Sequence, residues 1–214
     1  MMKNIYSVLM FAVMTASIAS CKMDDNDPYH VKIRKERYSK DSFFKVSNQS
    51  PFDLKAKREI SELPYFNPDI KYDVKGHLEL LDTPKPVRMA VSNSAPEAYF
   101  NLGKVVFDLN GTECKLSIFQ NAKSMKDPQA ANELFCPFTD ETSGKETYGS
   151  GRFLDLQRNP GSNDIEVDFN AAYNPYCAYN HEYSCPIPPM ENHLDFRVEA
   201  GEKKYKTGRF SFFK

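Results

Sequence analysis

Strict alternation of apolar and polar residues is the feature that most constrains the fold of this 214-residue chain. From Ile70 to Leu80, every second residue is apolar or glycine. Because alternate side chains of a strand point to opposite faces, this pattern predicts a strand with one face on a core. Two further apolar runs flank Asn110 and Gly111. Asn-Gly readily takes the positive φ angles of a tight turn, so these runs predict a β-hairpin over residues 105–118.

Further short apolar runs predict strands at 87–91, 134–138, 151–156, 165–169, 194–198 and 205–212. One helix is predicted over residues 29–44, which hold no Gly or Pro, and we expect Val31, Arg34 and Tyr38 on its inner side. About nine strands without alternating βαβ units favour a mainly β fold, either an antiparallel barrel or a sandwich-like domain. We expect residues 29–214 to form this single domain.

The first 21 residues resemble the signal of a bacterial lipoprotein. Lys3 precedes an apolar stretch over residues 5–16, and small residues follow it. Residues 18–21 resemble a lipobox, in which cleavage occurs before a lipidated cysteine. Residues 1–20 are therefore predicted to be a signal peptide and Cys21 the lipidated residue, which attaches the protein to a membrane. The alternative is a plain secretory signal with a cysteine there by chance.

Residues 21–28 are polar and acidic, as expected of a solvated tether. They also resemble the Lys-plus-acidic signal that sends some Gram-negative lipoproteins to the outer face of the outer membrane. We therefore expect an outer-membrane lipoprotein exposed at the cell surface, with an ordinary tether as the alternative. Because 28 Lys and Arg stand against 29 Asp and Glu, the chain lacks the basic excess that nucleic-acid binding requires, and we expect no nucleic-acid partner.

Several long motifs in the second half resemble an uncharacterised family of bacterial and archaeal proteins, known only as a domain of unknown function. They occupy residues 138–148, 151–154, 168–192 and 200–202. The family has no established reaction, so the resemblance implies no activity. Cys114 and Cys136 stand outside the family's motifs, and we expect both to be buried free thiols.

The cysteines of the proline-rich motif allow three interpretations. Cys177 and Cys185 are eight residues apart, and in an exported protein we expect a disulfide between them, which stabilises the fold by roughly 2–3 kcal/mol. The weaker alternative is a metal site made by Cys177, His181 and Cys185, although Pro186 makes a helical arrangement of these ligands unfavourable. A catalytic thiol beside His181 or His193 would require that no disulfide forms. We expect no cofactor.

Polar residues gather in two of these motifs, and we expect them to meet at one end of the sheet. The first motif contributes Asp140, Thr142, Thr147, Tyr148 and Arg152, and the second contributes Asn170, Asn174, Glu191 and Asn192. With Tyr173, Tyr176 and Tyr179 as apolar walls, this set would suit a small polar ligand or a glycan. In the alternative interpretation, the same residues hold turns and form ion pairs within the fold.

Two classes of function remain open. A ligand-binding or interaction module is favoured, because no G-x-S-x-G elbow and no P-loop can be found. The alternative is an extracytoplasmic hydrolase that uses Asp140 and Glu191 as acid and base. That alternative requires the two carboxyl groups to face each other at roughly 5–10 Å.

Overall fold

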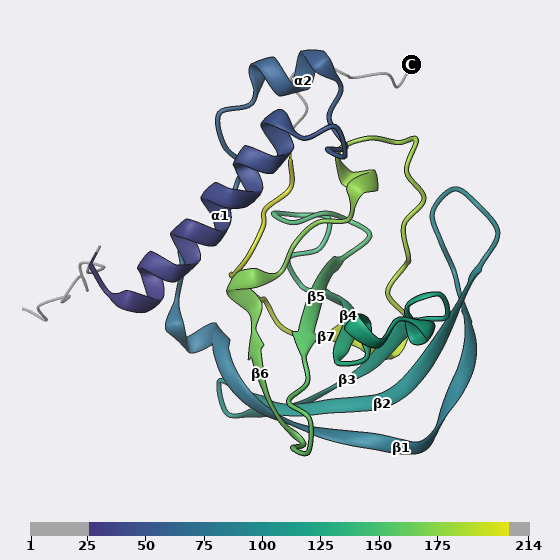
Figure 1. The fold of residues 1–214 in the computed structure, drawn as a ribbon. Coiled ribbons are helices and arrows are strands. Elements are labelled where there is room, and N and C mark those ends of the chain that lie inside the picture. The colour runs from purple at the N-terminus through teal and green to yellow at the C-terminus, as the bar shows by residue number, and fades with distance from the viewer. Residues whose placement is uncertain (1–25, 206–214) are drawn as a thin grey trace, which may run out of the picture.

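The computed structural model describes residues 26–205, and these form one curled antiparallel sheet with two helices beside it (Figure 1). The predicted signal peptide, Cys21 and the predicted strand from 206 onward lie outside the described residues. The strands are β1 (Asp73–Met89), β2 (Glu97–Leu109), β3 (Thr112–Asn121), β4 (Glu133–Asp140), β5 (Arg152–Gln157), β6 (Asp164–Asp168) and β7 (His193–Leu194). The prediction of a mainly β, antiparallel single domain with an N-terminal helix is confirmed.

The strand order β5-β4-β3-β2-β1-β6 curls into a half-barrel, and the two-residue β7 pairs with β4 in parallel. Three predicted strands differ from those observed. Residues 73–80 and 87–89 of two predicted strands belong to the single long strand β1, whose register with β2 shifts between Leu80 and Lys85. Residues 70–72 form a short 3₁₀ helix instead, and residues 90–91 lie beyond the end of β1. Strand β7 ends at Leu194, and residues 195–198 form no strand.

The predicted hairpin is present between β2 and β3. Asn110 and Gly111 form its turn with φ angles of 55° and 80°, and Leu109 pairs with Thr112 directly beside the turn. Positive φ at both positions is the geometry that favours this dipeptide.

Helix α1 (Pro28–Val46) is capped at its N-terminus by Asp27, whose carboxylate accepts hydrogen bonds from the backbone N–H groups of Tyr29 and His30. The expected inner face is wrong. Ile33 and Phe44 are buried instead, whereas Val31, Arg34 and Tyr38 are exposed. The sequence permits both stripes, and only contacts with distant segments select the one that is buried.

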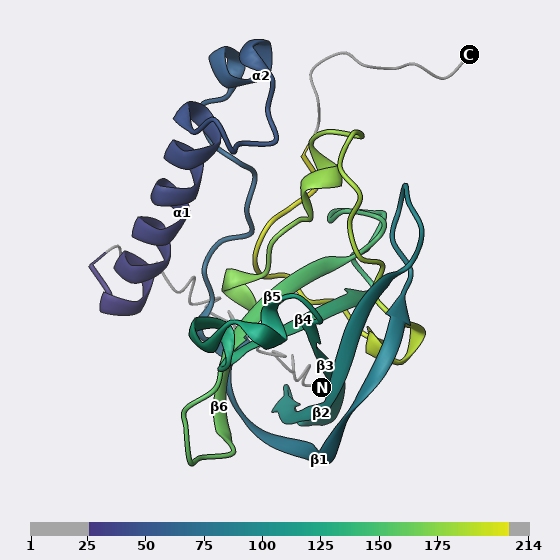
Figure 2. The same cartoon turned by 45° about the vertical axis from the view of Figure 1, so that its right-hand side comes forward.

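A second helix and six short 3₁₀ helices complete the fold of the described residues. They are α2 (Leu54–Glu59), η1 (Ile70–Tyr72), η2 (Ser124–Lys126), η3 (Pro128–Ala130), η4 (Phe169–Ala171), η5 (Tyr176–Ala178) and η6 (Met190–Asn192). Figures 1 and 2 show α2 and the segment around η5 at the same end of the half-barrel as the C-terminal part of α1. Within residues 26–205, no helix is both long and apolar enough to cross a membrane.

Strands β4 and β5 carry apolar side chains on both faces. Leu134, Cys136 and Leu154 belong to the main core, together with side chains from β1, β2, β3 and β6. Phe135 and Phe153, one residue out of phase, point to the opposite face and pack edge-to-face with ring centroids 4.8 Å apart. This second face is covered by residues 173–186, which position the candidate site.

Candidate functional site

The residues expected to bind a ligand at the end of β4 form a buried polar cluster, which we define as Asp140, Thr142, Thr147 and Arg152. The Asp140 carboxylate accepts from the Val198 backbone N–H at 2.7 Å and from the Thr142 hydroxyl at 2.9 Å. Its Oδ1 also lies 3.4 Å from Nη2 of Arg152. The structure thus brings these four predicted residues together, but their polar groups bond to the protein itself.

Arg152 connects this cluster to the end of the described chain. Its Nη2 donates to the Val198 carbonyl at 2.9 Å, and its Nη1 donates to the Ala200 carbonyl. The guanidinium group also lies over the ring of Phe138, 5.2 Å from its centroid. Because a buried cation requires compensating partners, Arg152 holds the 198–200 backbone against the ends of β4 and β5.

The side chains of the three expected asparagines bond to backbone groups outside the buried polar cluster. Asn192 bonds to Ser117 and Pro137 backbone atoms and so fastens η6 to β3 and β4. Asn170 bonds both backbone groups of Asp69. Asn174 donates to the Lys203 carbonyl at 2.9 Å. Each of these buried side chains therefore links two chain segments.

Glu202, which was not among the expected site residues, is fully buried at the centre of another network. Its carboxylate pairs with Lys40 of α1 and accepts hydrogen bonds from the Tyr179 hydroxyl and, at 2.8 Å, from the Asn174 backbone. Lys40 also lies over the Tyr173 ring, 4.8 Å from its centroid. This network fixes α1 against the proline-rich segment.

The hydrolase alternative loses its proposed pair of carboxyl groups in this geometry. Asp140 is buried and ion-paired with Arg152, whereas Glu191 is exposed to solvent. A buried, paired carboxylate has neither substrate access nor a free position for a water molecule. Asp140 is therefore unsuited to the role of acid or base.

Cys177 and Cys185 are buried neighbours with free thiols in this structure. The Cys177 backbone N–H donates to the Cys185 sulfur at 3.2 Å, and the Tyr148 hydroxyl lies 3.7 Å from the Cys177 sulfur. A hydrogen bond from the Cys185 thiol lowers the pKa of Cys177, and the same bond raises the pKa of Cys185. The disulfide is not formed here and stays a prediction, whereas the expectation that Cys114 and Cys136 are buried free thiols is confirmed.

The metal site considered at the cysteines does not assemble in the described part of the chain. The single group of three suitable ligands in residues 26–205 is Asp73, Glu166 and Asp168, so His181 does not join the thiols. Burial and the neighbouring carboxylates raise the pKa of Asp73 to about 6. Oxygen ligands of this kind suit a hard divalent cation, but Lys32 already pairs with Glu166 at 3.5 Å.

An open groove of about 590 Å³ lies on the second face of β4 and β5, between α1 and the proline-rich segment. We call it the aromatic groove because most of its wall is made of rings. Its lining residues are Lys40, Phe43, Phe44, Tyr99, Phe135, Phe153, Asp155, Tyr173, Pro175, Tyr176, Tyr183, Ser184, Cys185 and Pro186. Of the predicted apolar walls, Tyr173 and Tyr176 line it, whereas Tyr179 lines a different cavity.

Asp155 is the carboxylate of the aromatic groove. It reaches solvent and accepts a hydrogen bond from the Tyr173 hydroxyl at 2.8 Å. The surrounding protein removes part of its hydration and so raises its pKa, although the bond from Tyr173 acts in the opposite direction. Asp155 therefore offers a negative charge and hydrogen-bond acceptors among aromatic rings.

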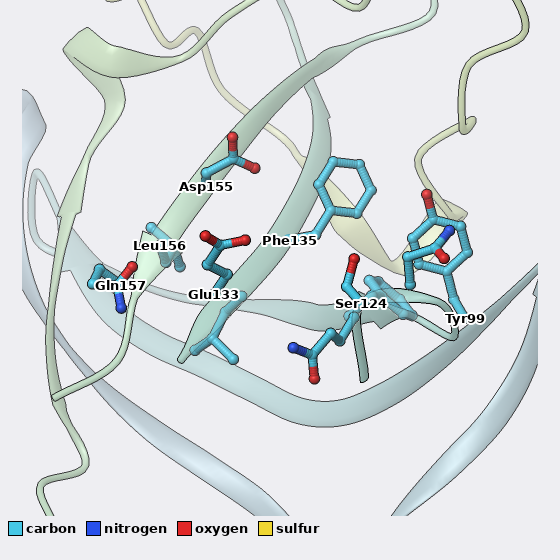
Figure 3. Close-up of a pocket in the computed structure, with 11 residues that line it drawn as sticks. Tyr99, Ser124, Glu133, Phe135, Asp155, Leu156 and Gln157 are labelled. Atoms are coloured by element: carbon cyan, nitrogen blue, oxygen red, sulfur yellow. The ribbon is translucent and has the colours of Figure 1, made fainter. Parts of the chain in front are cut away.

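A second hollow of about 360 Å³ adjoins the aromatic groove and shares Tyr99, Phe135 and Asp155 with it. Figure 3 shows Glu133 and Asp155 on the same side of β4 and β5, with Phe135 beside them. Glu133 is exposed to solvent. The two hollows together therefore offer aromatic surface with two accessible carboxylates.

The sequence contained a signal for the aromatic groove that the strand predictions did not use. On β4 and β5, Phe135 and Phe153 occupy the positions that alternate with the core residues, where polar side chains are expected if one face is in water. Aromatic residues at those positions indicate a second buried face. Which segment covers that face could not be read from the strands alone.

Comparison with known proteins identifies the family but no activity. The model of DUF1684, a protein of unknown function, matches residues 58–203. The solution NMR structure of an uncharacterised protein from Haloarcula marismortui is similar, with 34% identity, a TM-score of 0.64, and coverage of 84% of this chain and 96% of the other. No curated protein matches the sequence significantly. This chain therefore belongs to the DUF1684 family of proteins of unknown function.

Proposed function

We propose that this protein is a membrane-anchored lipoprotein that binds a glycan or a similar small ligand in the aromatic groove. The observation that carries the proposal is an open groove whose rings surround one solvent-accessible carboxylate. Binding sites for small molecules combine mainly apolar walls with a few well-placed polar groups. Part of the groove is lined by the proline-rich motif, as expected. Its carboxylate, however, is Asp155, which was not among the expected ligand-binding residues.

The aromatic groove suits a ligand with one flat apolar face and hydroxyl groups at its edge. Phe153 and Tyr173 pack edge-to-face with centroids 5.8 Å apart, and Tyr176 and Tyr183 do so at 5.3 Å. Phe153 is itself buried, but the half-buried rings of Tyr173, Tyr176 and Tyr183 offer flat apolar surface at low cost in side-chain entropy. Asp155 can accept hydrogen bonds from hydroxyl groups, and an ionised acceptor makes these bonds stronger.

p-Nitrophenyl glycosides are suitable probes for this groove, because they carry both a flat ring and hydroxyl groups. We expect saturable binding by saturation-transfer NMR and calorimetry. Replacing Tyr176 with Ala should reduce the affinity about tenfold, which corresponds to about 1.4 kcal/mol of lost contact. Tyr38→Ala removes an outward tyrosine elsewhere and serves as the matched control. Equal affinity of wild type and Tyr176→Ala would exclude the groove as the binding site.

The same probes distinguish a binding module from a hydrolase. Hydrolysis releases p-nitrophenolate, which is followed by its absorbance, whereas binding alone leaves the glycoside intact. We expect no release, because the pair of carboxyl groups suggested by the sequence is not available in the groove. Release that disappears in Asp155→Asn or Glu133→Gln would replace the binding proposal with a glycosidase that uses those residues.

Membrane attachment is tested at Cys21. In cells fed an alkyne-bearing fatty acid, the wild-type protein should become labelled and sediment with the outer-membrane fraction. Cys21→Ser should lose the label, because it removes the thiol that carries the diacylglyceryl group. Protease added to intact cells then tests exposure at the cell surface. A wild-type protein without label, secreted in soluble form, would support the plain secretory signal instead.

A further inference from the structure

Helix α1 has an outward face that is both apolar and basic. Val31 is 46% exposed and Tyr38 is 74% exposed. Arg34 and Lys35 lie between them along the helix and are exposed as well. Residues three, four and seven apart share one helix face, so these four side chains form a single stripe opposite the buried Ile33 and Phe44.

Further exposed apolar side chains stand at the end of α1 and at the start of α2. Val46 and Leu54 are each 74% exposed, and with Val31 and Tyr38 they make up half of the eight exposed large apolar side chains of residues 26–205. Residues 28–59 hold nine Lys and Arg against four Asp and Glu, although the whole chain is almost neutral. We call residues 28–59 the helical layer. Lys32 and Lys40 pair with carboxylates outside this layer, and the seven other basic residues still outnumber its four acidic ones. The layer therefore concentrates positive charge and exposed apolar surface on one part of the molecule.

The helical layer stands directly after the proposed lipid anchor. Six residues separate Cys21 from Pro28, and even a fully extended chain of this length spans only about 25 Å. The beginning of α1 therefore stays close to the surface that holds the lipid. Because the tether is short, the lipid anchor would hold this layer at a high effective concentration next to the membrane surface.

The chemistry of the helical layer matches an anionic lipid surface. Basic side chains near a negatively charged leaflet contribute attraction, and interspersed apolar side chains can enter the headgroup region. A second copy of this chain is a poorer partner, because a twofold contact would place the same basic layer against itself. We propose that the helical layer lies against anionic lipid headgroups, so that the domain is held to the membrane by this surface as well as by its lipid.

Vesicle sedimentation tests this proposal with the chain from Lys22 onward, which contains every described residue but no lipid. We expect binding to vesicles of phosphatidylcholine with phosphatidylglycerol, little binding to phosphatidylcholine alone, and release in high salt. Lys35→Glu should weaken binding at least fivefold, and Tyr38→Ala should weaken it measurably. Lys104→Glu makes the same charge change on exposed β2 and should change binding less than twofold.

Three outcomes would overturn the proposal. The first is equal binding to both kinds of vesicle or to neither. The second is an equal loss in Lys35→Glu and Lys104→Glu, which would show that only net charge matters. The third is a dimer in solution that Tyr38→Ala dissociates, which would assign the face to a second copy. The proposal draws on the lipid anchor for its geometry, but this experiment lacks the lipid, so failure of Cys21 labelling and failure of vesicle binding are separate results.

Discussion

The buried polar cluster and the aromatic groove lie at opposite faces of β4 and β5. The first contains polar residues that stabilise the fold, and the second contains residues that a ligand could reach. In the cluster, charged groups of Asp140 and Arg152 are enclosed and bonded to the protein. In the groove, the half-buried rings of Tyr173, Tyr176 and Tyr183 and the carboxylate of Asp155 remain accessible. Charged and polar side chains that resemble a binding site can thus stabilise the fold, while aromatic side chains elsewhere provide the surface proposed for a ligand.

Removal of Arg152 is the strongest test of this comparison. Arg152→Met should lower the free energy of unfolding by about 3–5 kcal/mol, because it leaves Asp140 buried without its cation and frees three backbone carbonyls. Urea unfolding measures the change. Arg88→Met, at an exposed position on β1, should stay within about 0.5 kcal/mol of wild type. If Arg152→Met left stability unchanged but abolished ligand binding, Arg152 would be a ligand-binding residue, as first expected.

Oxidation of the thiol pair tests the wall of the groove that Cys185 contributes. Treatment with oxidised glutathione should join Cys177 to Cys185, reduce the titratable thiols of residues 22–214 from four to two, and stabilise the fold by roughly 2–3 kcal/mol. Urea unfolding with and without reductant gives the difference. Cys177→Ser should show no such difference, whereas Cys114→Ser should retain it. A bound metal, detected by elemental analysis of the reduced protein, would contradict this interpretation.

The pH dependence of binding tests the role of Asp155. Its pKa is raised, so ionisation is lost at a higher pH than for an ordinary aspartate. We expect glycoside affinity to fall as the pH is lowered through this raised pKa, because a protonated carboxyl group is a weaker acceptor. Asp155→Asn should bind a few-fold more weakly at pH 7 and lose the pH dependence. Asp195→Asn, at an exposed position outside the groove, should behave as wild type.

The smallest expected change in the free energy of unfolding is at Asp73, a residue that belongs to neither the buried polar cluster nor the aromatic groove. Its folded-state pKa of about 6 exceeds its ordinary value of 3.8. The folded state therefore holds its proton more tightly, and stability falls as the pH rises through this window. Asp73→Asn should stabilise the protein by about 1 kcal/mol at pH 7, after allowance for solvent exposure, and by nothing near pH 3.5. Equal gains at both pH values, measured by urea unfolding, would exclude the electrostatic cause.

The elements that depend on local sequence could be predicted. Asn110 and Gly111 define their hairpin through their own backbone preferences, and the alternation at 74–80 is confirmed within β1. The inner face of α1 could not be predicted, because the sequence offers two apolar stripes. Phe44 is buried by contacts with Phe52 and Tyr179, and the latter lies 135 positions farther along the chain.

The residue types in 138–152 and 168–192 indicated that these segments hold many polar, hydrogen-bonding side chains. They did not indicate whether those side chains bind a ligand or bond to the protein itself. Asn192 was expected to meet a ligand, yet its amide bonds to the backbone of two strands. An asparagine in a turn and one in a binding site have the same donors and acceptors. Burial alone distinguishes them, and burial is a property of the assembled fold.

By itself, the sequence determined the mainly β class, the N-terminal helix, the hairpin and the family, because alternation, turn chemistry and long motifs are local properties of the chain. The tertiary structure decided which polar residues are enclosed, which stripe of α1 faces outward, and that aromatic side chains of β4, β5 and the proline-rich segment meet in one groove. These outcomes depend on contacts between distant segments, where packing selects among alternatives that the local pattern leaves equal.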